Sequence, residues 1–181
     1  MLERDDNSLV LECLKGDIGA FAELVDRYQK PLFNTALRMV GDYEEARDIT
    51  QDVFLKTYNN LAKYQPKYKF FSWVYRILVN ESINCLKKRK NHQELNEDMM
   101  ATGRTPDQEY EANVLSAKME EALRELTFDA RVVIVLRHFN DMGYQEMSDV
   151  LSIPAKTVKS RLYSARKNLA GILERRGVET W

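Results

Sequence analysis

Apolar residues recur every three or four positions along most of this chain, which is the spacing of one face of an α-helix. Such stripes run through residues 9–14, 21–28 and 32–40. Pro31 lacks a backbone N–H, so we expect it to open or kink the helix that follows it. The first forty residues therefore predict consecutive helices.

The residues Gly41 and Asp42, which follow the third stripe, mark a helix boundary. Gly41 stands where a left-handed C-terminal cap is usual, and Asp42 followed by Glu45 resembles the capping box of a new helix. Apolar positions continue from 46 to 61, and we expect a loop over 63–69, which contains Pro66. A further helix is predicted from about 70 to 88.

The helical pattern fails between Asn91 and Asn113, where the chain is acidic, poor in large aliphatic residues and interrupted by Gly103 and Pro106. We interpret this segment as a flexible acidic linker. Helical spacing resumes over 114–126, and Thr127 is a plausible cap for the next helix. The apolar run 132–136 could be a buried strand, but the helical pattern on both sides favours helix.

The predicted fold is all-α, with two small helical domains. A bundle over 1–90 precedes the linker 91–113, and a four-helix domain follows over 114–176. The 181 residues include only 7 Gly and 4 Pro, which favours long helices over a sheet rich in tight turns. The composition, 44% hydrophobic and 30% charged, is that of an ordinary soluble protein with a core.

Targeting and redox features are sparse. There is no apolar run of membrane-spanning length, and the acidic N-terminus lacks a signal-peptide core, so we expect a cytoplasmic protein. Cys13 and Cys85 lie far apart without CxxC spacing. We interpret them as buried apolar residues in a reducing compartment, not as a disulfide or as metal ligands.

The net charge of −1 conceals charge sorted along the chain. Residues 1–62 carry −5, 63–90 carry +7, 91–130 carry −7 and 131–181 carry +4. Two separate basic segments indicate two contacts with a polyanion. The alternative is that both are solvated helix faces.

Catalytic chemistry has little support in this sequence. The two histidines, His92 and His138, belong to no metal-binding motif, and the glycine patterns of phosphate-binding loops and of nucleophile elbows are missing. We therefore expect no enzyme activity, no metal and no cofactor.

The segment 143–169 predicts a helix-turn-helix. Its first helix covers 144–151, Ser152 and Ile153 form the turn, and Pro154 suits the first turn of the second helix. In that helix Val158, Leu162, Ala165 and Leu169 form a buried stripe, whereas residues 155–176 carry a net charge of +6. Cations that reach phosphates and hydroxyls that reach base edges suit the major groove. The alternative is an amphipathic hairpin with a solvated face.

The basic segment 63–90 interleaves cations with aromatic residues, which single-stranded nucleic acid requires for stacking and for holding its backbone. The aromatic residues are Tyr64, Tyr68, Phe70, Phe71, Trp73 and Tyr75. Some must belong to the core, and Trp73, one turn before Ile77, is a candidate for partial burial. We expect about half of the six rings to be exposed.

Three segments together resemble an extracytoplasmic-function (ECF) sigma factor of bacterial RNA polymerase. Residues 44–61 resemble the polymerase-binding part of sigma region 2, and residues 69–90 resemble its promoter-melting and minus-10-reading part. Residues 126–169 resemble region 4, which reads the minus-35 element. This chain has Ser148 and Ser152 where family members often have Ala and Gly, so we expect modest strain at Ser152.

The resemblance implies binding to core RNA polymerase through its largest and second-largest subunits, binding to promoter DNA, and control by an anti-sigma factor. The implied polymerase contacts are Asp48, Gln51, Asp52 and Phe54, with Phe54 as an exposed aromatic. The implied minus-10 contacts are Tyr68, Phe71, Trp73, Tyr75, Asn80, Asn84 and Lys87. The expected minus-35 contacts are Lys156, Thr157, Lys159, Ser160, Arg161, Tyr163, Ser164 and Arg166.

Within the second helix of the helix-turn-helix, Lys159, Ser160 and Tyr163 are expected to approach bases, and Arg161 to reach the phosphate backbone. Family members often carry a cationic or aromatic residue at Ser164. Two other functions stay open: a helix-turn-helix regulator acting independently of sigma function, and a polymerase-binding adaptor or anti-sigma decoy. The regulator would not need the aromatic strand-melting segment, and the adaptor would not need a basic recognition helix.

Overall fold

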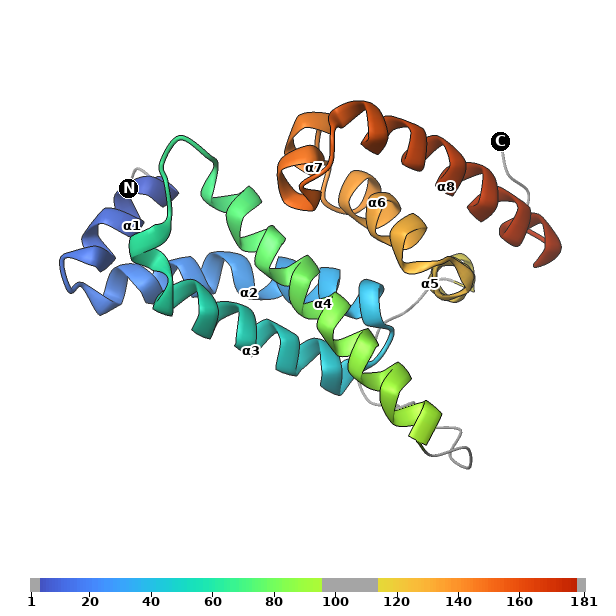
Figure 1. The fold of residues 1–181 in the computed structure, drawn as a ribbon, viewed down its shortest axis with the longest axis horizontal. Coiled ribbons are helices and arrows are strands. Elements are labelled where there is room, and N and C mark those ends of the chain that lie inside the picture. The colour runs from blue at the N-terminus through green and yellow to red at the C-terminus, as the bar shows by residue number, and fades with distance from the viewer. Residues whose placement is uncertain (1–3, 96–113, 179–181) are drawn as a thin grey trace.

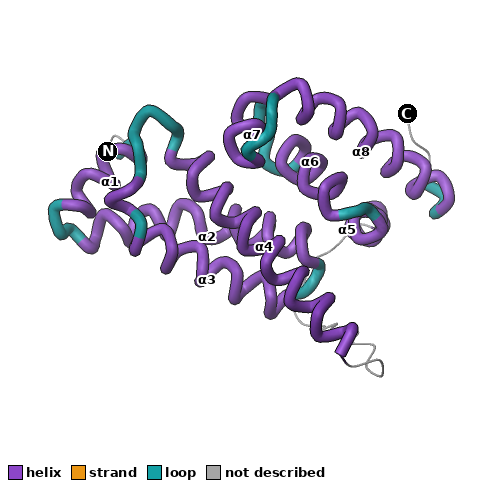
Figure 2. The backbone as a smooth tube through the Cα atoms, viewed as in Figure 1, coloured by secondary structure: helices purple, strands orange, loops and turns teal. Residues whose placement is uncertain are grey.

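The computed structural model describes residues 4–95 and 114–178, and within these two ranges the secondary structure is helical throughout, without strands (Figures 1 and 2). The N-terminal part comprises α1 (Asp6–Leu14), α2 (Ile18–Val40), α3 (Tyr43–Asn59), the short 3-10 helix η1 (Leu61–Lys63) and α4 (Phe70–Leu95). The C-terminal part comprises α5 (Val114–Glu125), α6 (Phe128–His138), α7 (Tyr144–Leu151) and α8 (Ala155–Arg175). The prediction of an all-α fold is confirmed.

The boundary between α2 and α3 follows the sequence signals. Gly41 ends α2 with φ +76°, a left-handed conformation. Glycine adopts this conformation with less strain than any residue that has a Cβ. The Asp42 carboxylate accepts a hydrogen bond from the Glu45 N–H at 2.9 Å and caps α3. In a capping box the Glu45 side chain would bond back to the backbone N–H of Asp42. Here the Glu45 carboxylate instead forms an ion pair with Arg89 of α4.

Pro31 does not begin a new helix, because α2 runs through it without interruption. An interior proline costs about 3 kcal/mol. Burying one leucine side chain contributes about 1.5–3 kcal/mol, and Leu24 and Leu32, on the same helix, are at most 1% exposed. Pro31 itself lies on the exposed side of the helix, so its ring does not disturb the core.

The helix-turn-helix lies where the sequence places it. Met147 and Val150 of α7 are buried, as are Val158, Leu162, Ala165 and Leu169 of α8. Ser152 has φ 55° and ψ 39°, the left-handed conformation that leads to the expected strain. Thr127 occupies the N-cap position of α6, as expected, and Pro154 that of α8, but neither side chain makes a capping hydrogen bond.

The run 132–136 is fully buried within α6, which confirms helix over strand. Helix α4 continues to Leu95, past the expected start of the linker at Asn91. The rest of that segment, 96–113, lies outside the described residues.

The two parts of the chain pack against each other. Helix α7 lies along α4, and α6 lies against α2 (Figure 1). Two cations at the start of α4 contact the helix-turn-helix, since Lys69 pairs with Glu146 and Arg76 donates to the carbonyl oxygen of Asp149. No helix among residues 4–95 and 114–178 is long and apolar enough to cross a membrane.

Candidate functional site

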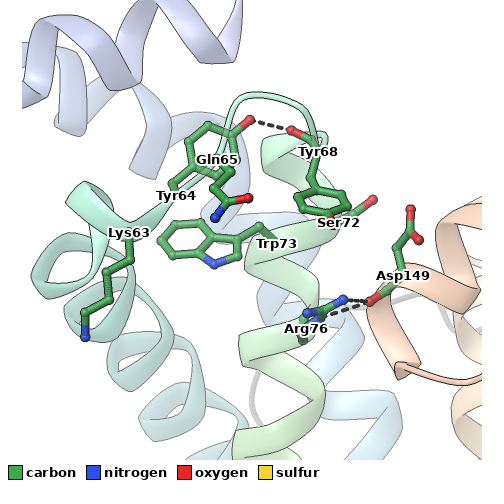
Figure 3. A pocket seen from close by; sticks show the side chains of 8 residues that line it. All are labelled: Lys63, Tyr64, Gln65, Tyr68, Ser72, Trp73, Arg76 and Asp149. Atoms are coloured by element: carbon green, nitrogen blue, oxygen red, sulfur yellow. Dashed lines mark hydrogen bonds between the residues drawn. The ribbon is translucent and has the colours of Figure 1, made fainter.

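A pocket of about 310 Å³ opens beside the loop between η1 and α4 (Figure 3). Loop residues line one side, and α4 supplies the other. Its lining residues are Lys63, Tyr64, Gln65, Tyr68, Ser72, Trp73, Arg76 and Asp149. The pocket therefore combines an indole, phenol rings and two cations, a set that suits a nucleobase with its phosphate.

The loop is held in shape by Tyr64. Its ring is buried and packs edge-on against Phe70 and tilted on Trp73, with centroid distances of 5.5 and 5.4 Å. The Tyr64 hydroxyl donates a hydrogen bond of 2.6 Å to the carbonyl oxygen of Tyr68 (Figure 3). Burial raises the pKa of Tyr64 further above its ordinary value, which favours the protonated hydroxyl that donates this bond. Tyr64 thus fixes both the loop backbone and one face of the indole.

Fewer rings are exposed than the sequence predicted. Tyr68 is exposed, Trp73 and Phe71 are half-buried, and Tyr64 and Phe70 are in the core. Tyr75 is only 1% exposed and packs on Phe71 at a centroid distance of 4.4 Å. Its assignment to the minus-10 surface is wrong, because a ring in the core cannot stack on a base. Trp73 and Tyr68 line the pocket, and Phe71 does not.

A polar ridge continues from the pocket along α4. Asn80, Asn84 and Lys87, at helical spacing, are all exposed. Asn80 also lines a second hollow of about 290 Å³, which shares Trp73 with the first pocket and includes Lys56, Asn60 and Glu81. Lys56 and Glu81 form an ion pair of 2.6 Å across it. The indole of Trp73 thus borders both hollows.

The expected polymerase-binding residues lie on α3. Asp48, Gln51 and Asp52 are exposed. Phe54 is half-buried and packs against the core, so the expectation of an exposed aromatic there is wrong. The exposed apolar neighbours are Leu55, 63% exposed, and Tyr58, whose ring lies 5.0 Å from that of Phe21. The apolar contribution of this surface therefore comes from residues that the sequence did not single out.

The recognition helix α8 presents one polar face. Opposite its buried stripe lie Lys156, Ser160, Tyr163 and Lys167, all exposed, with Tyr163 73% exposed. The flanks of this face carry Lys159, Ser164 and Arg166, which are also exposed, and Thr157, which is half-buried and whose carbonyl accepts from the Ser160 hydroxyl at 3.0 Å. The helix therefore offers cations, hydroxyls and one phenol along a single accessible side.

Two arginines of α8 have partners on α6. Arg161 lies 3.4 Å from Asp129, across a shallow hollow near the buried stripe. The Nε of Arg166 donates to the Nε2 of His138 at 3.1 Å. Burial and the neighbouring guanidinium groups lower the pKa of His138, which keeps it a neutral acceptor.

Several residues of the pocket were missed in the sequence. Lys63, Gln65, Ser72 and Arg76 line it, and Arg76 lies one helical turn after Trp73. That spacing is the signal that could have identified it. Cys13 and Cys85 are free and half-buried, not fully buried as expected, and burial raises the pKa of Cys85 to about 11. Among the residues that the structure describes, no cluster of side chains is suited to hold a metal ion.

Comparison with protein families gives two matches in the order of the two helical parts. Residues 24–92 match Sigma-70 region 2, and residues 116–169 match Sigma-70 region 4. The first match contains the lining residues of the pocket except Asp149, together with the ridge and the exposed face of α3, and the second contains the helix-turn-helix.

Relatives and solved structures agree with both matches. The chain is 31% identical over 167 residues to the ECF RNA polymerase sigma factor SigW of Bacillus subtilis, covering 86% of this chain and 89% of SigW. It is 27% identical to the RNA polymerase sigma-H factor of Pseudomonas aeruginosa, covering 96% of each. The fold resembles RpoE in complex with the anti-sigma factor NepR from Bartonella quintana, with a TM-score of 0.76 at 20% identity, covering 87% of this chain and 98% of RpoE. It also resembles CnrH in complex with the cytosolic domain of CnrY, with a TM-score of 0.72 at 25% identity, covering 94% and 97%. The chain belongs to the ECF family of RNA polymerase sigma factors, which are transcription initiation factors and not enzymes.

Proposed function

We propose that this chain binds core RNA polymerase, recognises minus-35 and minus-10 promoter elements, and holds the opened non-template strand. The observation that carries the proposal is the pocket of Tyr68, Trp73 and Arg76 beside the exposed polar ridge of α4. Opening a duplex costs about 1.4 kcal/mol per stacked step. Each base stacked on a protein ring contributes about 1–3 kcal/mol, so capture of one or two bases offsets local melting.

The three surfaces have separate roles in this proposal. The exposed carboxylates and amide of α3 dock on the largest polymerase subunit, where acidic and amide groups beside apolar ones suit a protein interface. The ridge Asn80, Asn84 and Lys87 reads minus-10 bases. The exposed face of α8 reads minus-35 bases, with Lys159, Ser160 and Tyr163 near base edges and Arg161 near the phosphates.

Control by an anti-sigma factor is part of the proposal. Among the solved structures of similar fold, the sigma factor RpoE is in complex with the anti-sigma factor NepR, and CnrH is in complex with the cytosolic domain of CnrY. A helix-turn-helix regulator acting alone is not favoured, because it would not need the Sigma-70 region 2 segment, which supplies the aromatic rings of the pocket.

The direct test is transcription by core polymerase with and without this protein on a library of promoters. We expect transcripts that start only when the protein is present, from promoters that share two elements. If no promoter responds, the proposed function is wrong. Retention of DNA binding in that case would favour the independent regulator.

A further inference from the structure

Helix α1 is joined to the loop that lines the pocket, through the same tyrosine that holds this loop in shape. The helix lies beside η1, which leads into the loop (Figure 1). The Tyr64 hydroxyl, already bonded to the Tyr68 carbonyl oxygen, also donates to Oδ1 of Asn7 in α1 at 2.7 Å. The Sigma-70 region 2 match begins only at residue 24. Asn7 therefore links the pocket to a helix outside that match.

The two bonds of the Tyr64 hydroxyl have different consequences. Tyr64 and Tyr68 belong to the same loop, so the bond between them fixes the shape of the loop but not its place in the domain. The bond to Asn7 spans 57 positions of sequence and ties the loop to a separate helix. The packing of the Tyr64 ring on Phe70 and Trp73 is apolar and non-directional, whereas a hydrogen bond weakens steeply away from its preferred angle. Asn7 therefore sets where the phenol lies against the Trp73 indole.

Helix α1 is itself fixed against α2. Leu9 and Val10 are at most 2% exposed. The Asp6 carboxylate accepts a hydrogen bond from the Tyr28 hydroxyl of α2. Burial and this bond raise the pKa of Tyr28, which favours the protonated hydroxyl that donates it. The Tyr28 ring packs edge-on against Phe70 at the start of α4, with a centroid distance of 5.6 Å. Asn7, next to Asp6, is thus presented to the loop from a fixed position.

We propose that Asn7 is a positioning residue of the pocket, which holds Tyr64 and hence the Trp73 indole in the orientation that receives an unstacked base. This inference rests on the proposed role of the pocket in holding the non-template strand. Asn7 lies on the exposed side of α1 and does not line the pocket, so it acts through the Tyr64 hydroxyl. A base stacks on the face of a ring, so a rotated indole gains less from stacking. Promoter opening therefore depends on a residue of α1.

The test compares Asn7→Ala, Tyr64→Phe and the double variant with wild type. Gln29→Ala removes an exposed side-chain amide from α2 and serves as the matched control. The chain has two tryptophans, Trp73 and Trp181, so Trp181→Phe in every protein leaves the pocket indole as the only one. Acrylamide quenching of its fluorescence measures the accessibility of the indole in the free protein. Permanganate reactivity measures opening of a responsive promoter by each protein with core polymerase, and urea denaturation measures stability.

We expect Asn7→Ala to increase the quenching of Trp73 and to lower promoter opening about 2- to 10-fold, which corresponds to the loss of one hydrogen bond. Tyr64→Phe should be at least as impaired, because it also loses the bond to Tyr68. The double variant should be no worse than Tyr64→Phe, because both substitutions remove the same bond. Gln29→Ala should match wild type in all measurements.

Three results would overturn the inference. If Asn7 contributed to stability alone, Asn7→Ala would lower the midpoint of urea denaturation and leave the quenching of native Trp73 unchanged. Normal promoter opening by Asn7→Ala, or an additive loss in the double variant, would also contradict it. Failure of the proposed function looks different, since wild type itself then opens no promoter, whereas failure of this inference leaves wild type active.

Discussion

Arg166 of the recognition helix donates a hydrogen bond to the ring nitrogen Nε2 of His138 at the end of α6. The contact joins two residues far apart in the sequence and places a titratable group beside a proposed minus-35 contact. Because His138 accepts this bond, the contact requires the neutral imidazole.

The lowered pKa of His138 predicts a pH dependence of stability. Burial and the charges of Arg166 and Arg137 disfavour its protonation in the folded state. The unfolded chain therefore binds this proton first, and stability falls as the pH drops below about 6.5 toward the folded pKa. We expect the free energy of unfolding of wild type to decline over this window relative to His138→Gln, measured by urea denaturation at several pH values. Parallel curves for the two proteins would contradict the assigned cause.

Asp48→Arg tests the polymerase-binding surface on α3. The carboxylate is exposed, so the substitution should change stability by no more than about 0.5 kcal/mol. Binding to core polymerase should be lost in a pull-down, because the interface gains a repelling charge. Asp26→Arg, at an exposed carboxylate of α2, is the control and should bind normally. If both variants bind core polymerase equally well, residues 44–61 do not form the proposed interface.

Trp73→Ala and Tyr75→Ala should now give different results. Trp73 lines the pocket, and its loss should impair promoter opening, measured by permanganate reactivity of unpaired thymines, more than formation of the closed complex. Tyr75 is in the core, and truncating a buried ring costs about 3–5 kcal/mol of stability. The conservative change Tyr75→Phe should preserve opening. Normal opening by Trp73→Ala would contradict the stacking role.

Lys159→Ala and Arg161→Ala should separate base reading from phosphate binding. Loss of a base contact costs about 1–3 kcal/mol and relaxes preference at one position, whereas loss of a phosphate contact weakens all sequences alike and lowers the salt slope by about one. We expect the first result for Lys159 and the second for Arg161. Competition binding on matched and mutated minus-35 duplexes at several salt concentrations measures both. If Arg161→Ala relaxes base preference and Lys159→Ala weakens all sequences alike, then Arg161 reads bases and Lys159 binds phosphates.

Asp129 gives an internal check on Arg161. Its carboxylate lies 3.4 Å from that guanidinium, so Asp129→Ala should release Arg161 and strengthen binding to all duplexes equally. The same substitution in the Arg161→Ala background should have a smaller effect. An equal gain in both backgrounds would show that Asp129 acts by general repulsion of DNA.

Ser152→Gly should stabilise the protein. A left-handed conformation costs a residue with a Cβ about 1–2 kcal/mol, and glycine adopts it without this cost. We expect a gain of up to about 1 kcal/mol in the free energy of unfolding, because glycine also loses more backbone entropy on folding. Ser152→Ala retains the Cβ and should give no such gain. Equal stability of the glycine and alanine variants would mean that the strain is relieved elsewhere.

Local sequence determined the helices, the left-handed cap at Gly41 and the buried stripe of α8. Each depends on spacing or backbone preference within a few residues. Sequence motifs are also local, so the resemblance to ECF sigma factors was enough to identify the segments that carry the proposed contacts.

Tertiary structure decided what depends on burial by distant segments. Tyr75 and Trp73 are close in sequence and chemically alike, but Tyr75 is buried against Phe71, whereas Trp73 packs on Tyr64 and Phe70 and lines the pocket. Pro31 is tolerated inside α2 because the opposite face of that helix is buried. The contact of Arg76 with Asp149 joins residues 73 positions apart. No local pattern encodes such a pairing, because it depends on how α7 packs against α4 in the tertiary structure.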